Sequence, residues 1–418
     1  MLLKEVVIQA ASAVRDHRFR AGLTMLGIAW GIVTVVLLLA YGQGFHRALT
    51  VGFRNAFSDG VGVLRGGQTS LQAGGERAGR RIRLKVDDVP LVAEQGFVKY
   101  VSPEYLDSLT VSWGTRQTTV GVRGVAPEYG IMRSETPEAG RFLNHEDVER
   151  RRRVAFLGAE VVRRLFSNIQ PVGETVRIAG VSFEVIGVLS NKAQLSSYYY
   201  PDKMSVFVPH TTMRQLWPRE FVNDLVFQAL DPSLGLEAEA QVRAALAARY
   251  RFDPRDDRAV TIFGSRQIMQ IAGGMSTGLQ VVLIFIGTLT LMIGGVGVMN
   301  IMLVSVQERT REIGVRKALG ARRRHILLQF LLEGLAITAA GGLIGILLSF
   351  ALVAVAGSQP FLAELIDDPS KQTDIHLLLS PGLLLTATGI LGVTGLLSGF
   401  VPAFRASRLD PIESLRYE

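Results

Sequence analysis

The sequence predicts an α-helical membrane protein with four transmembrane helices and a mixed α+β domain outside the cytoplasm. Three observations carry this prediction: a mean hydropathy of +0.28 over 418 residues, four long apolar runs with almost no charge, and a long segment of alternating strand and helix patterns between the first two runs. Soluble domains usually have a mean hydropathy near or below zero. Much of the chain is therefore expected to face lipid.

A helix needs about 20 largely apolar residues to cross the hydrocarbon core of a bilayer. We expect transmembrane helices at 21–43, 276–305, 326–356 and 379–401. The first run could also be a cleaved signal peptide. Its apolar core, however, exceeds the roughly 7–15 residues of a signal peptide, and no small-x-small cleavage site follows it. We interpret it as a retained anchor.

The second apolar run is longer than a membrane requires. It stays uncharged over 271–306, and such a helix would be roughly 54 Å long against a hydrocarbon core of about 30 Å. We therefore expect a helical stalk at 271–278, and a similar extension of the first span through 44–57. A flexible linker at Gly273 and Gly274 is the alternative interpretation.

The short flanks of the spans differ in charge. Lysine and arginine in short loops are enriched on the cytoplasmic side of a membrane. Both termini and the loop 306–325 are therefore expected in the cytoplasm, and 44–275 and the short loop 357–378 outside it. The cations that carry this assignment are Lys4, Arg15, Arg18, Arg20, Arg309, Arg311, Arg316, Lys317, Arg322, Arg323, Arg324, Arg405, Arg408 and Arg416.

The segment between the first two spans is expected to have a mixed α+β fold, in one domain or in two subdomains. A hairpin turn is expected at Ala179 and Gly180, and a helix at 159–166. A second helix at 236–250 is expected to place Leu236, Ala240, Val242 and Leu246 near one face. The run 198–201, three tyrosines and a proline, is either a contact surface or part of a packed hairpin. Strands are expected at 61–64, 118–122, 154–157, 175–178, 182–189, 205–208, 225–230 and 260–263.

Residue types exclude several chemistries. There is no cysteine, which excludes thiol catalysis, thiolate metal sites and disulfides. His145 and Glu146 begin like a zinc-protease motif, but Glu149 occupies the position of the second histidine. No serine nucleophile elbow and no nucleotide-binding Gly-x-x-x-x-Gly-Lys-Ser/Thr loop occur. We expect no catalytic, cofactor or metal residue. The net charge of +8 fits a cationic cytoplasmic face, so no nucleic-acid partner is expected.

Two cytoplasmic segments carry an amphipathic pattern. At 1–20 an interfacial helix is expected, which either anchors to membrane lipid or docks a cytoplasmic partner. The loop 306–325 suits a short charged helix in which Val315 and Leu319 form an apolar edge and which Gly320 ends. Charge is nearly absent within the spans. Glu333, in the third span, is the exception, and we expect it to have a structural role.

Glycines spaced by four residues recur in three of the spans. This small-xxx-small spacing lets helices approach closely. Packing within the chain is one use of the spacing, and the seam of a dimer is the other. The glycines are Gly27, Gly31, Gly341, Gly345, Gly395 and Gly399.

Several motifs resemble one known family. The stretches GVMNIM at 297–302, ERTREIGVRKALGA at 308–321 and PAFRASRLDPIESLRYE at 402–418, together with LTMLGI at 23–28, resemble the FtsX-like permease domain of MacB-type ABC transporters. The FtsX-like region would cover about 252–418. GRFL at 140–143 and PVGE at 171–174 resemble the MacB-like periplasmic core domain more loosely.

The resemblance implies a permease subunit of the bacterial inner membrane. It would work as a homodimer, or as a heterodimer with a related permease, over two copies of an ABC ATPase subunit that binds ATP and Mg²⁺. A periplasmic adaptor is left open. The loop helix would contact the ATPase. The residues assigned to this contact are Glu308, Arg309, Arg311, Glu312, Arg316 and Lys317.

One departure from the family concerns the ATPase. MacB carries a fused nucleotide-binding domain, whereas this chain shows no nucleotide-binding loop, so a separate ATPase chain is expected. ATP hydrolysis would then move the external domain, by mechanotransmission, to export or extract a substrate from the periplasm or outer leaflet. The alternative is a membrane-anchored sensor or binding protein that transmits a signal without transport.

Overall fold

The computed structural model describes residues 18–415, apart from Ala56, Asn168, Ala193, Ser196 and 367–370. The amphipathic helix predicted at 1–20 therefore lies almost entirely outside the described residues. The chain divides into two compact units. One, the membrane unit, comprises 1–46, 274–359 and 375–418, and the other, the sheet domain, comprises 47–273 and 360–374. The predicted fold class, four apolar helices and an α+β domain, is confirmed.

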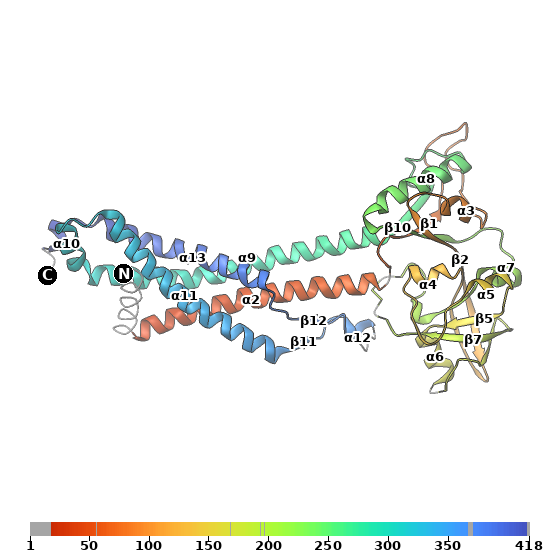
Figure 1. The fold of residues 1–418 in the computed structure, drawn as a ribbon, viewed down its shortest axis with the longest axis horizontal. Helices are drawn as coiled ribbons and strands as arrows, with labels where there is room; N and C mark the ends of the chain where they lie inside the picture. Colours follow the sequence, from red (N-terminus) through yellow and green to blue (C-terminus); the bar gives the residue numbers. More distant parts are fainter. Residues whose placement is uncertain are drawn as a thin grey trace. The chain divides into compact units, whose positions relative to one another are not determined.

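Among the described residues, four helices are long and apolar enough to cross a membrane by length and composition (Figure 1). The fourth begins as the sequence predicts, because Ser380 accepts a hydrogen bond from the amide of Leu383 at 3.2 Å and Pro381 follows at the first helical position. The helices are α2 Arg18–Arg54, α9 Ser265–Glu308, α11 Arg323–Ala356 and α13 Pro381–Arg408.

Two of these helices exceed a membrane span. Helix α9 has 44 residues, which corresponds to roughly 66 Å at about 1.5 Å per residue. It continues without a break through Gly273 and Gly274, so the linker alternative is wrong. Helix α2 has 37 residues and ends at Arg54, within the extension expected through 44–57.

Short elements complete the membrane unit. Helix α10, Thr310–Ala318, follows α9, and helix α14, Pro411–Leu415, follows α13. A two-residue ladder joins β11, Ser358–Gln359, to β12, Ile375–His376. Between these two strands along the chain lies α12, Ala363–Ile366, which belongs to the sheet domain.

The sheet domain is built on one sheet in the order β10-β1-β9-β2-β3-β8-β5-β7-β4, with β6 paired to β2 and β7. Successive residues point to opposite faces of a strand. Val63 of β1 lies in one apolar core and Leu64 in another, so the sheet carries a core on each face. The strands are β1 Val61–Gly66, β2 Val98–Trp113, β3 Arg116–Val125, β4 Pro137–Gly140, β5 Val154–Leu157, β6 Thr175–Ile178, β7 Val181–Leu189, β8 Ser205–Pro209, β9 Asp224–Ala229 and β10 Val260–Gly264.

Among the described residues, six α-helices (α3 to α8, labelled in Figure 1) and two short 3₁₀ turns accompany the sheet. The helix predicted at 159–166 has those bounds. The helices are α3 Asp88–Ala93, α4 Glu128–Met132, α5 His145–Glu149, α6 Ala159–Phe166, α7 His210–Leu216 and α8 Gly235–Tyr250, and the turns are η1 Asp202–Met204 and η2 Pro232–Leu234.

The predicted hairpin turn is confirmed. Ile178 of β6 pairs with Val181 of β7, and the two residues between them, Ala179 and Gly180, have φ values of 45° and 84°. Positive φ at both central positions defines the two-residue turn that matches strand twist.

The predicted apolar face of α8 is partly wrong. Leu236 is 52% exposed and Ala240 is also exposed, whereas Ala238, Val242 and Leu246 are buried. The spacing 238, 242, 246 follows the helical period, and position 240 lies well off that line. The pattern favoured Leu236 because it is the more apolar residue, whereas the smaller Ala238 is the one that is buried.

Candidate functional site: the loop helix and the anchors of the long helices

Three cations of the predicted coupling segment turn inward and hold α10 in the membrane unit. Arg309 lies 3.2 Å from a carboxylate oxygen of Glu333, which is only 2% exposed. Arg316 donates to Gln329 Oε1 at 3.0 Å. Lys317 donates to the backbone carbonyl of Ser407 at 3.1 Å and to that of Leu409. These bonds tie α10 to α11 and to the end of α13.

Close packing adds to this attachment. Ile313 is 1% exposed. A Cβ at Gly314 would lie 2.7 Å from the Cβ of Ser414, nearer than such atoms approach in proteins. Glycine is therefore required where α10 meets α14. The sequence analysis did not single out this contact, although the pair Ile313-Gly314 in the middle of a charged helix was a usable signal.

The other three predicted residues, Glu308, Arg311 and Glu312, are exposed. Val315 and Leu319 continue the same side of the helix at spacings of three and four residues, and they are 44% and 85% exposed. We call Arg311, Glu312, Val315 and Leu319 the outer face of α10. The predicted apolar edge is real, but it points away from the bundle.

The six predicted glycines differ in how closely they are packed. A Cβ at Gly31, Gly341, Gly345 or Gly395 would lie within 3.0 Å of a side chain of a neighbouring helix of the same chain. At Gly27 the nearest atom is 4.0 Å away and at Gly399 it is 3.5 Å away. The first group thus serves packing within the chain.

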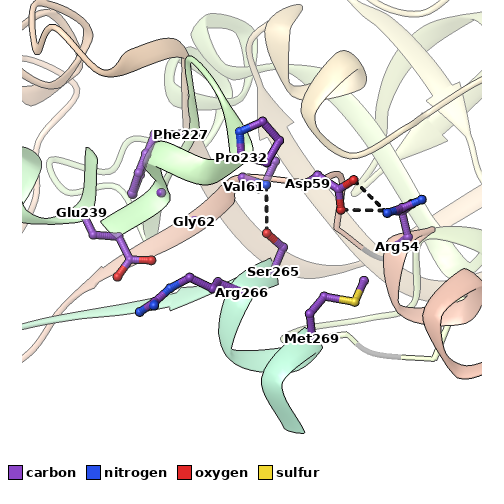
Figure 2. A pocket seen from close by; sticks show the side chains of 12 residues that line it. Arg54, Asp59, Val61, Gly62, Phe227, Pro232, Glu239, Ser265, Arg266 and Met269 are labelled. Atoms are coloured by element: carbon purple, nitrogen blue, oxygen red, sulfur yellow. Dashed lines mark hydrogen bonds and ion pairs between the residues drawn. The ribbon is translucent and has the colours of Figure 1, made fainter. Parts of the chain in front are cut away.

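The ends of α2 and α9 that belong to the sheet domain line a small cavity of about 190 Å³ (Figure 2). Arg54 at the end of α2 pairs with Asp59 at 3.1 Å. Ser265, the first residue of α9, accepts a hydrogen bond from the amide of Gly60 at 3.1 Å. Both long helices are therefore fixed to the residues that lead into β1. Glu239 of α8 also lines this cavity, and burial raises its pKa.

A network of buried charges lies in the sheet domain and contacts Phe57, shortly after the end of α2: the guanidinium of Arg133 is 4.2 Å from the centre of the Phe57 ring. Arg123 of β3 donates to Glu104 of β2 at 2.7 Å and to the hydroxyl of Tyr129 at 2.9 Å. Tyr198 donates to the second oxygen of Glu104 at 2.6 Å. Asp202 is held by Arg133 at 3.3 Å and by a lysine ammonium at 2.9 Å. We call Glu104, Arg123, Arg133, Glu135, Lys192 and Asp202, with the hydroxyls of Tyr129 and Tyr198, the buried network.

Sequence reasoning did not find the buried network, because its members are scattered from position 104 to 202. It did single out the tyrosine run at 198–201. The hairpin interpretation of that run is wrong, since the run lies in the loop between β7 and β8, which do not pair with each other. The same loop contacts α2: the amide of Leu195 donates to the carbonyl of Gly52 at 3.2 Å. One loop thus joins the end of α2 to the buried network.

Within the part of the chain that the structure describes, no group of three histidine or carboxylate side chains is placed to hold a metal ion.

Comparison with known proteins gives two family matches. The MacB-like periplasmic core domain matches residues 21–245, and the FtsX-like permease C-terminal matches residues 284–411. A macrolide export ATP-binding/permease protein MacB from Bdellovibrio bacteriovorus is 35% identical over 412 residues, which are 98% of this chain and 61% of that protein. The MacB of Chlorobium phaeobacteroides is 32% identical over 414 residues, 98% of this chain and 60% of that protein. This chain therefore spans about 60% of the length of these relatives.

A solved structure, the periplasmic region of MacB from Actinobacillus actinomycetemcomitans, is 20% identical with a TM-score of 0.43, and the match covers 53% of this chain and 95% of that chain. The matched families follow the two parts of the fold, with the first span and most of the sheet domain in one and the last three spans in the other. The chain belongs to the family of MacB-like ABC-transporter permeases, proteins of the inner membrane.

Proposed function

We propose that this chain couples ATP hydrolysis on a cytoplasmic ATPase to movement of the sheet domain outside the membrane. The observation that carries the proposal is the division of α10 into two sides. Its inner side is bonded to the membrane unit through Arg309, Arg316 and Lys317. Its outer face keeps Arg311 and Leu319 exposed, as a surface that receives force from a partner requires.

Charge supports the proposed orientation. The loop that contains α10 carries seven lysine or arginine residues between 309 and 324, and such loops stay in the cytoplasm. With four spans, both termini then lie in the cytoplasm and the sheet domain lies in the periplasm.

We assign the ATPase activity to a separate partner chain. The 418 residues contain no nucleotide-binding loop, whereas the relatives are named ATP-binding/permease proteins. We assign ATP and Mg²⁺ to two copies of a separate ABC ATPase subunit beneath a dimer of this chain or of this chain with a related permease. The work done outside the membrane would be the export or extraction of a substrate from the periplasm or the outer leaflet, with a periplasmic adaptor as a further partner.

Anchoring of the long helices supplies the path for the movement. Helix α9 leads directly from the segment before α10 to Ser265, which is bonded to Gly60 of the sheet domain. Helix α2 ends at Arg54, which is paired with Asp59. A displacement of either helix along its axis would therefore be applied to the start of β1.

The test is co-purification of an ABC ATPase with this chain, followed by ATP turnover in nanodiscs. The variant is Arg311→Glu, which reverses a charge on the outer face without touching a bond to the bundle. We expect loss of the ATPase from the complex. The matched control is Arg177→Glu, an exposed arginine of β6 in the sheet domain, which should leave the complex intact.

Two outcomes would overturn the proposal. One is a complex that survives Arg311→Glu combined with Leu319→Ala. The other is a partner whose ATP turnover is the same with and without this chain. The second outcome would favour the sensor alternative, in which the membrane helices carry a signal without transport.

A further inference from the structure

The sheet domain contains a second cleft of about 560 Å³, separate from the helix anchors and from α10. It is bounded by β1, by the segment 81–84, by Leu106 of β2, by the tyrosine loop and by 221–223. Its lining includes three arginines and no acidic residue. This composition differs from that of the cavity at the helix anchors and from that of a third cleft described below.

The three arginines are presented differently. Arg65 is fixed by Asp224, to which its Nε and Nη2 donate at 2.6 and 2.7 Å, so that its Nη1 takes part in neither bond. Arg81 and Arg83 are exposed. The guanidinium of Arg83 lies 5.1 Å from the ring centre of Phe221, a cation–π distance. Asp224 balances one cation, so two positive charges of the lining remain without a carboxylate in it.

Apolar surface lies directly beside these charges. Ile82, Leu84 and Leu106 form buried parts of the walls, and the rings of Tyr199 and Phe221 are partly exposed. Small-molecule sites commonly combine a mostly apolar wall with a few fixed polar groups.

Several of these groups are held in place before any ligand arrives. Arg65 is held by two bonds to buried Asp224. Tyr198 lines the cleft and is held by its bond to Glu104 in the buried network. Asn223 accepts a hydrogen bond from the amide of Leu106 at 2.9 Å, which leaves its NH₂ group as a donor. Fixed donors lose little entropy on binding and therefore contribute more to affinity.

Two other cavities of the domain fit an anion less well. The cavity at the helix anchors contains Arg54 and Arg266, but also Asp59 and Glu239, so its charges balance. A larger cleft of about 680 Å³ is lined by Glu128 and Glu135 without an arginine or lysine.

We propose that the cleft at Arg65, Arg81 and Arg83 binds an anionic amphiphile, a molecule in which a phosphate or carboxylate group adjoins an apolar or aromatic part. The anionic group lies between the guanidinium groups of Arg81 and Arg83 and the free Nη1 of Arg65, since arginine binds such groups through paired donors. The apolar part lies on Phe221 and Tyr199. The ligand is either the headgroup region of a lipid or a soluble aromatic acid of the same chemistry.

The test measures binding to the full chain in nanodiscs of zwitterionic lipid, without nucleotide. The probes are dihexanoyl phosphatidic acid below its micelle concentration, phenyl phosphate, inorganic phosphate and, as the zwitterionic control, dihexanoyl phosphatidylcholine. We expect the first two to bind and the last two to bind at least tenfold more weakly. A lipid source predicts that the phosphatidic acid binds at least tenfold more tightly than phenyl phosphate, and a soluble source predicts the reverse order.

The decisive variant is R81Q with R83Q, which removes two exposed charges and should weaken binding at least tenfold. Its matched control is R153Q with R177Q, which removes two exposed arginines of the same domain outside the cleft. A second variant, Phe221→Ala, should weaken phenyl phosphate and leave inorganic phosphate unchanged. Absence of binding by the unaltered chain, equal binding by R81Q/R83Q, or equal affinity for inorganic phosphate would each overturn the proposal. Because no ATPase takes part, the result is independent of the coupling test.

Discussion

The membrane unit and the sheet domain differ in how many charged side chains they bury. In the membrane unit the helices approach through glycine, as where Gly345 faces Ile32 and Gly395 faces Thr338, and the carboxylate of Glu333 is paired with Arg309 near the end of the bundle. In the sheet domain six charged side chains of the buried network have exposures of 9% or less. Three are cations and three are acids.

The difference follows from what surrounds each unit. In lipid an uncompensated charge or polar group costs several kcal/mol, so helices of the membrane unit meet through small side chains and dispersion contacts. In a water-exposed domain a buried ion network is tolerated only if each member keeps its partners. The network serves to position other residues, because it holds Tyr198 and the loop that contacts α2 at Gly52.

The largest effect is expected on breaking the buried network at Arg123. In Arg123→Leu, Glu104 and Asp202 lose a partner and remain buried, which should destabilise the sheet domain by about 3–5 kcal/mol. Thermal unfolding of the full chain, followed by tryptophan fluorescence, measures this. The double variant Glu104→Leu/Arg123→Leu should recover part of the loss. A single variant as stable as the unaltered chain would show that the network is not complete in solution.

The next effect is a pH dependence from the same network. Burial and the nearby charge of Asp202 raise the pKa of Glu135 to about 8 from an ordinary value of 4.5, against the opposing charges of Lys192 and Arg133. The folded state therefore binds more protons than the unfolded state between about pH 4.5 and 8, so stability falls as pH rises through that window. The slope is at most about 1.4 kcal/mol per pH unit for one proton.

Glu135→Gln checks this assignment, because the amide keeps the shape of the protonated acid and cannot ionise. We expect the unfolding midpoint of the variant to fall less between pH 5.5 and 8 than that of the unaltered chain. An identical pH slope in both proteins would mean that Glu135 is ionised throughout.

Glycine packing in the membrane unit should give a smaller but local effect. A Cβ at Gly345 would lie 2.5 Å from Ile32 Cγ2 and 2.7 Å from the carbonyl oxygen of Ala29. Gly345→Ala should therefore cost about 1–3 kcal/mol, as overpacking does. The matched control is Gly389→Ala in α13, where nothing lies within 4 Å. Equal thermal stability of the two variants would refute tight contact between α2 and α11.

The four spans could be predicted from the sequence because each needs only length and apolar composition. Most strands of the sheet domain could also be predicted, since short apolar runs such as 154–157 end at polar residues. Strand β2 could not. It carries Pro103 and Asp107 and buries Ser102 and Glu104, so its sequence lacks the alternation that marks a strand.

The candidate sites could likewise be predicted only in part. The existence of α10 could be predicted from its charge pattern and from Gly320. Which of its cations turn inward depends on α11 and α13, and the residues they contact there are 13 to 92 residues further along the chain. Arg309 faces Glu333, 24 residues later, and Lys317 faces the end of α13. The buried network depends on partners from two strands, β2 and β3, from α4 and from the segments 133–135 and 192–202, and no local sequence pattern indicates it.

The last prediction compares two arginines of α10. It involves the smallest effect on stability and is the most informative. Arg316 donates to Gln329 and is partly buried, so Arg316→Ala should lower stability by about 1 kcal/mol. Arg311 is exposed on the outer face, so Arg311→Ala should change stability by less than about 0.5 kcal/mol. Stimulation of the partner's ATP turnover should follow the opposite order, with Arg311→Ala the more damaging. Parallel unfolding and turnover measurements on the two variants give both quantities. If both quantities fell together in each variant, α10 would be a structural brace and not the surface on which the ATPase acts.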